Sequence, residues 1–140
     1  MSKTKQRLFS LTLVAAMFFV LAIPASARAS AYIDTAAITT KSLGNGKISI
    51  RLDVVATTTM NEVGATQIIV NEKGANGKYS PVYIYTTEKH NLKAKNCAYY
   101  TANVTYQGVS GKDYYITAQC YAKNASGSGT SWVGSKTVHA

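Results

Sequence analysis

The residue types that build catalytic and metal sites are scarce in this sequence of 140 residues, which contains two histidines, two cysteines and six carboxylates. No Ser-His-Asp order and no G-x-S-x-G motif occurs. Zinc sites need closely spaced cysteine and histidine ligands, whereas the nearest such pair, His90 and Cys97, is seven positions apart. We therefore expect no enzyme activity, no bound metal and no cofactor.

Long hydrophobic runs are also scarce, and the clearest one lies near the N-terminus. Residues 8–23 carry no charge, follow a cationic start and end at Pro24. This run is shorter than the roughly 20 residues that span a bilayer, and the small residues after it provide two cleavage frames. We expect a signal peptide at residues 1–29, cleaved after Ala27 or Ala29, and a secreted protein without a transmembrane segment.

Negative charge is sparse, because 15 lysines and arginines face six acidic residues and give a net charge of +9. Four basic residues lie in the expected signal peptide, so residues 30–140 keep 11 basic and 6 acidic residues, a net charge of +5. The single arginine among them argues against a nucleic-acid partner. The cluster of Lys89, Lys93 and Lys95 suits either a mild attraction to acidic wall polymers or phospholipid heads, or a solvated loop.

Helical periodicity is almost absent after residue 30, while period-two alternation recurs along the chain. Residues 47–55 show it best, and the preceding Asn45-Gly46 pair suits a tight hairpin turn to an earlier strand. Residues 30–140 should form a single all-β domain, a two-sheet antiparallel sandwich of about seven strands. The expected strands are residues 31–39, 47–55, 65–72, 81–88, 98–107, 113–124 and 130–138.

The run from Tyr100 to Gly127 resembles the later strands of fibronectin type III and other immunoglobulin-like domains. An alternating strand, a loop ending near glycine, a tyrosine at the start of the next strand and Ala-x-Asn at its end occur together. The resemblance implies an immunoglobulin-like sandwich with Tyr114 as the tyrosine corner, whose phenol packs inward and whose hydroxyl bonds a nearby backbone group. The proline and leucine common in that loop are absent here.

A second resemblance covers most of the chain after residue 30. The segments "AYIDTAAI", "GKISIRLDVVATTTMNEVGATQIIVNE", "YSPVY" and "VTYQGVSGKDYY" occur in this order. They resemble a group of small secreted proteins of Gram-positive bacteria known only as a domain of unknown function. This likeness implies a bacterial, extracellular setting and carries no activity with it.

Two cysteines in an exported chain are usually oxidised when their geometry allows it. A two-residue turn at Gly108-Val109 would place Cys97 opposite Cys120 in a hairpin, where they could form a disulfide. If the connection instead crosses between sheets, as in fibronectin-like domains, the bridge could join the two layers. The alternative is two free thiols, with Cys120 as a small core residue on the apolar face of its strand.

Tyrosine is abundant, with ten residues, and all of them lie after residue 30 together with the single tryptophan. We expect Tyr100, Tyr106 and Tyr114 to face the interior. Flat rings with a polar tip suit stacking on sugars or contact with another protein, although tyrosine also fills strands for its own packing. The expected function is a non-catalytic extracellular binding module for carbohydrate or protein, and the alternative is a small secreted antagonist of neighbouring cells. The candidates for an outer binding surface are Tyr83, Tyr85, Tyr99, Tyr115, Tyr121 and Trp132.

Overall fold

Hydrogen bonds join seven strands into one antiparallel sheet in the computed structural model, which describes residues 30–140. The expected signal peptide lies outside the described residues. The all-β prediction is confirmed, because the described part contains, besides strands, a single helical turn, α2 (Thr87–His90). The strands are β1 (Ile33–Gly44), β2 (Lys47–Lys73), β3 (Tyr79–Thr86), β4 (Lys93–Gln107), β5 (Asp113–Asn124), β6 (Gly127–Gly134) and β7 (Val138–His139).

The first two strands form the hairpin that the sequence predicts. Gly44 pairs with Lys47 across the turn. Asn45 and Gly46 between them have φ angles of 55° and 79°, the positive values that a tight two-residue turn requires. Gly46 also lies against the carbonyl of Gly108, where any side chain would collide, and its own carbonyl accepts a hydrogen bond of 2.8 Å from the Gly108 N–H.

Strand β2 is the centre of the sheet, since β1, β3, β4 and β5 all pair with it. The sequence predicted two separate strands, 47–55 and 65–72, and this division is wrong: both belong to one strand of 27 residues. The polar run Thr57–Thr59 separates them in the sequence. Beyond it the buried residues Met60 and Val63 continue the inward-facing side of β2, so the strand does not end there.

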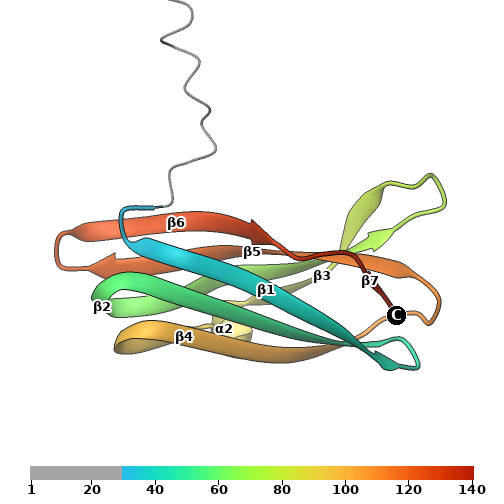
Figure 1. The fold of residues 1–140 in the computed structure, drawn as a ribbon, viewed down its shortest axis with the longest axis horizontal. Helices are drawn as coiled ribbons and strands as arrows, with labels where there is room; N and C mark the ends of the chain where they lie inside the picture. The colour runs from blue at the N-terminus through green and yellow to red at the C-terminus, as the bar shows by residue number, and fades with distance from the viewer. Residues whose placement is uncertain (1–29) are drawn as a thin grey trace, which may run out of the picture.

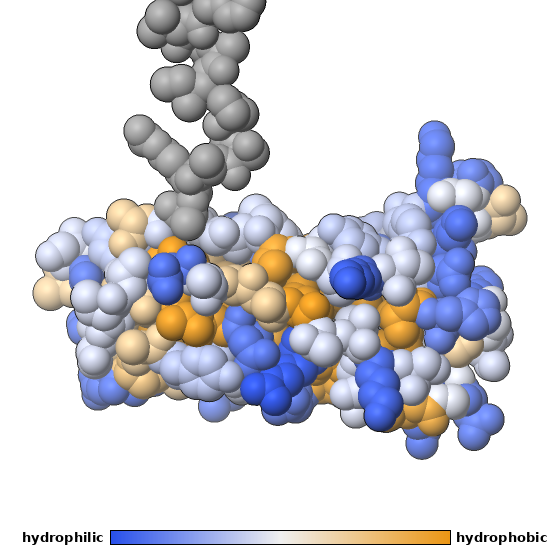
Figure 2. Space-filling view, in the orientation of Figure 1, coloured by the Kyte–Doolittle hydropathy of each residue, from blue (hydrophilic) through white to orange (hydrophobic). Residues whose placement is uncertain are grey.

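The sheet curls until its two halves face one another. Strand β4 pairs with β2 from Lys47 to Gly64, so β1 and β5 share the opposite side of β2 and follow one another along it. Figure 1 shows β2 and β4 bending round at one end of the molecule. The bend brings β1 against β5 and β6. In Figure 2, hydrophobic surface appears along the line of β1 in this view, where the two halves meet.

The core lies between the two halves of the curled sheet. Ile48, Ile50 and Leu52 from the first half of β2 are fully buried, as are Ile68 and Val70 from its second half. Their alternation with half-buried or exposed residues explains why the chain adopts strands here, because each strand needs one apolar face against the core. Within residues 30–140 no helix has the length and apolar composition that crossing a membrane would require.

The predicted disulfide is absent, because β4 and β5 do not form a hairpin with one another. Both strands pair with β2 instead: Cys97 lies opposite Met60, and Cys120 lies opposite Ala65. With β2 between them, the two backbones are separated by at least two inter-strand spacings, about 9.6 Å, which is beyond the roughly 7 Å that a disulfide can bridge. Both cysteines are free thiols, so the alternative with Cys120 in the core is the one observed.

Candidate functional site

Three aromatic residues share the outer face of β5 and β6. Tyr115 and Tyr121 alternate with fully buried residues along β5, so their side chains point away from the core. Trp132 of β6 lies directly opposite Gln119 of β5 and therefore shares this face. Trp132 is 55% exposed, while Tyr115, Gln119 and Tyr121 are half-buried. We call Tyr115, Gln119, Tyr121 and Trp132 the platform face.

Neighbouring residues hold the side chains of the platform face in place. Thr66 Oγ1 donates a hydrogen bond of 2.8 Å to Oε1 of Gln119, which fixes the orientation of that amide. Tyr115 leans over Gly134 of β6, where any side chain would collide with the tyrosine hydroxyl. The ring of Tyr115 also meets that of Tyr79, with 6.1 Å between centroids. The result is an ordered surface of rings around one amide.

Gly64 allows a positive charge to reach the platform face. It lies in β2 between Lys93 of β4 and Tyr121 of β5, its two cross-strand partners. Because Gly64 has no side chain, Lys93 can cross β2, and its Nζ lies 4.0 Å from the centroid of the Tyr121 ring. This cation–π contact orders the ring and places an ammonium group at the border of the platform face.

Tyr99 is the most exposed of the tyrosine candidates, at 49%, but it lies on the first half of the sheet. Its hydroxyl donates a hydrogen bond of 2.7 Å to Oδ1 of Asp53. Nε of Arg51 donates to both oxygens of the same carboxylate, at 3.1 and 3.0 Å. The Tyr99 hydrogen bond, assisted by Thr101 and Arg51, lowers the pKa of Asp53 from its ordinary value. Tyr99 therefore belongs to a polar network of its own.

Tyr83 and Tyr85 lie on the core side of β3. Tyr85 is only 6% exposed, so its predicted place on the outer surface is wrong. Burial raises the pKa of its phenol, and its ring packs against those of Tyr83 and His90, with centroids 4.7 and 4.9 Å away. Tyr83 remains partly exposed and its ring also meets Tyr106. Alternation in the sequence shows that these two residues share a face, but not which face it is.

Tyr114 is completely buried at the start of β5. Its hydroxyl accepts a hydrogen bond of 2.8 Å from the backbone N–H of Val109, five residues upstream, and donates one of 2.8 Å to Oε2 of Glu72. Gly108 lies against the ring, which leaves no space there for a side chain. This geometry makes Tyr114 a structural residue that lies apart from the platform face.

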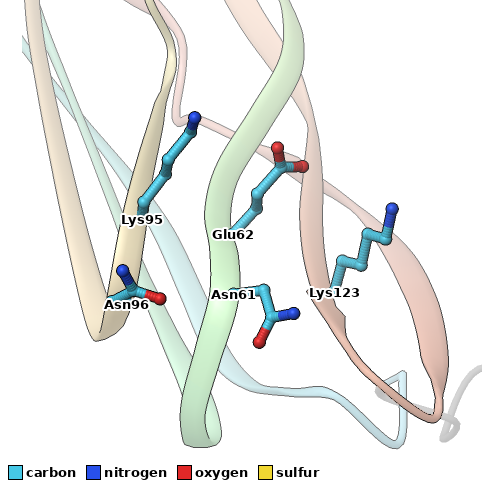
Figure 3. A pocket seen from close by; sticks show the side chains of 5 residues that line it. All are labelled: Asn61, Glu62, Lys95, Asn96 and Lys123. Atoms are coloured by element: carbon cyan, nitrogen blue, oxygen red, sulfur yellow. The ribbon is translucent and has the colours of Figure 1, made fainter.

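A second feature, which the sequence did not predict, is a hollow of about 380 Å³ at the end of the molecule where β2 and β4 bend. In the strand register, Glu62 of β2 lies opposite Lys95 of β4 on one side and opposite Lys123 of β5 on the other. Figure 3 shows these three side chains in a row on three neighbouring strands, with Asn61 and Asn96 below them. Lys95 belongs to the basic cluster seen in the sequence, but Lys123 is far from it along the chain, so only the pairing brings them together.

The cysteines and histidines of residues 30–140 lie on four different elements, Cys97 on β4, Cys120 on β5, His90 on α2 and His139 on β7. Burial raises the pKa of the Cys120 thiol to about 12, which keeps it protonated and unreactive. His90 packs on Tyr85, and His139 bonds Asp113 at 2.7 Å near the C-terminus. Within residues 30–140, no three side chains of histidine, cysteine, aspartate or glutamate gather as metal ligands would. The groups that the platform face and the hollow present are rings, amides, ammonium groups and the Glu62 carboxylate.

No protein-family model matches this chain, and no curated protein matches it in sequence.

Proposed function

We propose that this chain is a secreted, non-catalytic binding module that contacts carbohydrate or protein through the platform face. The observation that carries the proposal is the exposure of Trp132 beside two tyrosines and an ordered amide. A large aromatic side chain left in water forgoes the free energy that its burial would provide. A bound sugar ring or protein side chain would recover that free energy.

We also propose that the two halves of the curled sheet correspond to the two layers of an immunoglobulin-like sandwich. Strand β1 packs against β5 and β6, as strands of facing layers do, and the core lies between the halves. Tyr114 bonds the loop before its strand, as a tyrosine corner does. Superposition of an experimental structure on fibronectin type III domains tests this proposal, and a poor match of the strand order would refute it.

Export is part of the proposal, and it rests on the composition of residues 1–29. The intact mass of the protein recovered from culture medium should correspond to a chain that begins at Arg28 or at Ser30. Recovery of the full-length chain in the cell fraction alone would contradict export.

Affinity electrophoresis through gels that contain dissolved polysaccharides, together with pull-down of culture-supernatant proteins, tests the platform face directly. We expect the unaltered protein to be retarded by a polysaccharide or to retain a protein partner. Trp132→Ala and Tyr121→Ser should remove this retention and shift the melting temperature by no more than a few degrees, because both side chains lie outside the core. Leu43→Ala, at another exposed apolar residue, is the matched control and should leave retention unchanged.

The alternative proposal, a secreted antagonist, predicts a different outcome in a separate assay. Purified protein at micromolar concentration would clear a lawn of indicator bacteria, whereas a binding module leaves the cells intact. Clearing without retention on any polymer or protein would favour the antagonist. Equal retention of the Trp132→Ala variant and the unaltered protein would show that binding does not use the platform face.

A further inference from the structure

The hollow beside the platform face carries more positive than negative charge. Lys95 and Lys123 flank Glu62, and among the described residues no ammonium group lies within ion-pair distance of the Glu62 carboxylate. The carboxylates that do have a basic side chain within this distance lie elsewhere, at Asp53, Glu72 and Asp113. The two lysine ammonium groups at the hollow are therefore available to an anion from outside the chain.

The hollow and the platform face form one continuous surface. Lys123 and Tyr121 are two residues apart on β5, so they share its outer face. Lys95 and Lys93 are likewise two residues apart on β4, and Lys93 contacts the Tyr121 ring directly. A ligand that lies on the platform rings thus meets ammonium groups within the same surface.

We propose that the hollow binds the acidic groups of an anionic polysaccharide whose sugar rings lie on Tyr121 and Trp132. This inference rests on the proposed binding function and names the class of ligand. Strands β4 and β5 stand two spacings apart, about 9.6 Å at the backbone. Lys95 and Lys123 can therefore each meet a separate acidic group along one polymer.

The chemistry of the lining fits such a polymer. The lysine ammonium group is a compact positive charge that can meet carboxylates in varied orientations, whereas an arginine guanidinium favours a fixed bidentate arrangement. The amides of Asn61 and Asn96 both donate and accept hydrogen bonds, as sugar hydroxyl groups require. Because Lys95 and Lys123 are exposed, their contribution should weaken as salt screens the charges.

The experiment compares acidic polysaccharides with matched neutral forms. Polygalacturonate, alginate and hyaluronan are used, each beside the same polymer with its carboxyl groups reduced to alcohols, in affinity gels at low and moderate salt. We expect at least one acidic polymer to retard the protein about tenfold more strongly than its reduced form, with the difference shrinking as salt rises. Equal retardation by both members of every pair would overturn the anionic preference.

Two variants with opposite expected effects locate the binding. Lys95→Gln with Lys123→Gln should weaken binding of the acidic polymer about threefold to tenfold, the range expected for two partly screened charges. Glu62→Gln removes the negative charge between them and should strengthen the same binding by a few fold. Melting temperatures close to that of the unaltered protein verify that the variants fold.

Lys73→Gln with Lys78→Gln is the matched control, because it removes the same charge at exposed positions near the β2–β3 turn, away from the hollow. If this control weakened binding as much as the Lys95 and Lys123 pair did, attraction would follow the overall charge, and the hollow proposal would fail. Binding of a neutral polysaccharide or a protein through Trp132, without any acidic preference, would leave the proposed function standing and refute only this inference. If the unaltered protein bound no polysaccharide and no protein, both this inference and the proposed function would be refuted.

Discussion

The phenol of Tyr114 and the carboxylate of Glu72, cross-strand partners in β5 and β2, are joined by a hydrogen bond of 2.8 Å. The same hydroxyl accepts a hydrogen bond from the backbone N–H of Val109. One buried oxygen atom thus connects the second half of β2 with the loop that enters β5.

Replacing Tyr114 by phenylalanine removes both hydrogen bonds while keeping the ring. We expect Tyr114→Phe to lower the free energy of unfolding by about 1–3 kcal/mol, because the Val109 N–H and the Glu72 carboxylate each lose a partner. Urea denaturation measures the change. Tyr79→Phe is the control, since its exposed hydroxyl meets only Thr137, at 3.3 Å, and it should change stability by less than about 0.5 kcal/mol. Equal, small effects of the two substitutions would contradict the role of Tyr114.

Acid should destabilise the protein through its hydrogen-bonded carboxylates. Bonds from Lys112 and Tyr114 lower the pKa of Glu72 from its ordinary value of 4.5, and the bond from Tyr99 lowers the pKa of Asp53 from 3.8. A carboxyl group whose pKa falls on folding stabilises the fold above its unfolded pKa, and this contribution is lost as pH falls through the folded value. The melting temperature should therefore fall as pH drops from about 4.5 towards 2.

The corresponding variant separates this effect from general charge repulsion at low pH. Glu72→Gln should show a smaller loss of melting temperature between pH 5 and pH 2, on the order of a few degrees less, because one linked group has been removed. Glu88→Gln changes an exposed carboxyl of α2 and should follow the unaltered protein. Identical acid profiles for all three would refute the linkage.

Alkylation and intact mass test the placement of the two cysteines. In urea without reductant, both Cys97 and Cys120 should react, which gives two alkyl groups per chain, because both are free thiols. In the folded protein, Cys120 should not react, since it is buried and its pKa is raised to about 12. A mass that shows no alkylation in urea until reductant is added would reveal a disulfide and a different pairing of β4 and β5.

Gly64 should tolerate no side chain. A methyl group there would collide with the Leu92 carbonyl, which accepts a hydrogen bond of 2.8 Å from the N–H of Ala65. We expect Gly64→Ala to lower the free energy of unfolding by about 1–3 kcal/mol, as overpacking of a filled site does. Gly74→Ala, in the exposed turn after β2, would approach the flexible end of Asn76 and make ordinary contact with the Lys78 carbonyl at 3.4 Å, and it should change stability by less than about 0.5 kcal/mol. A neutral Gly64→Ala would mean that β2 and the segment before β4 can separate at no cost.

The sequence predicted the local elements well because alternation and turn chemistry act over short distances. The strands around Ile50 and Ile116 and the Asn45-Gly46 turn follow directly from these signals. The continuity of β2 was missed because Thr57–Thr59 interrupts the apolar pattern without ending the strand. The pairing of β4 and β5 with β2 was missed because alternation shows which residues share a face, but not which strand lies beside them.

The same limit applies to the candidate site. Alternation placed Tyr115 and Tyr121 on the outer face of their strand, and the structure adds Trp132 to them through its pairing with Gln119. Alternation could not show that Tyr85 points inward, since on an edge strand either face can be the exposed one. The row of Lys95, Glu62 and Lys123 depends entirely on strand register, which a single sequence does not reveal.

The length of β2 also determines the order in which the molecule can fold. Its first half can pair with β1 as soon as both have been synthesised, but its second half needs β5, whose residues come much later in the chain. Until then the apolar residues of that second half have an unpaired edge, which another chain could occupy. Pairings so distant in sequence form slowly. A chain truncated before β5 should therefore aggregate, because one edge of the second half of its longest strand would be left without a partner.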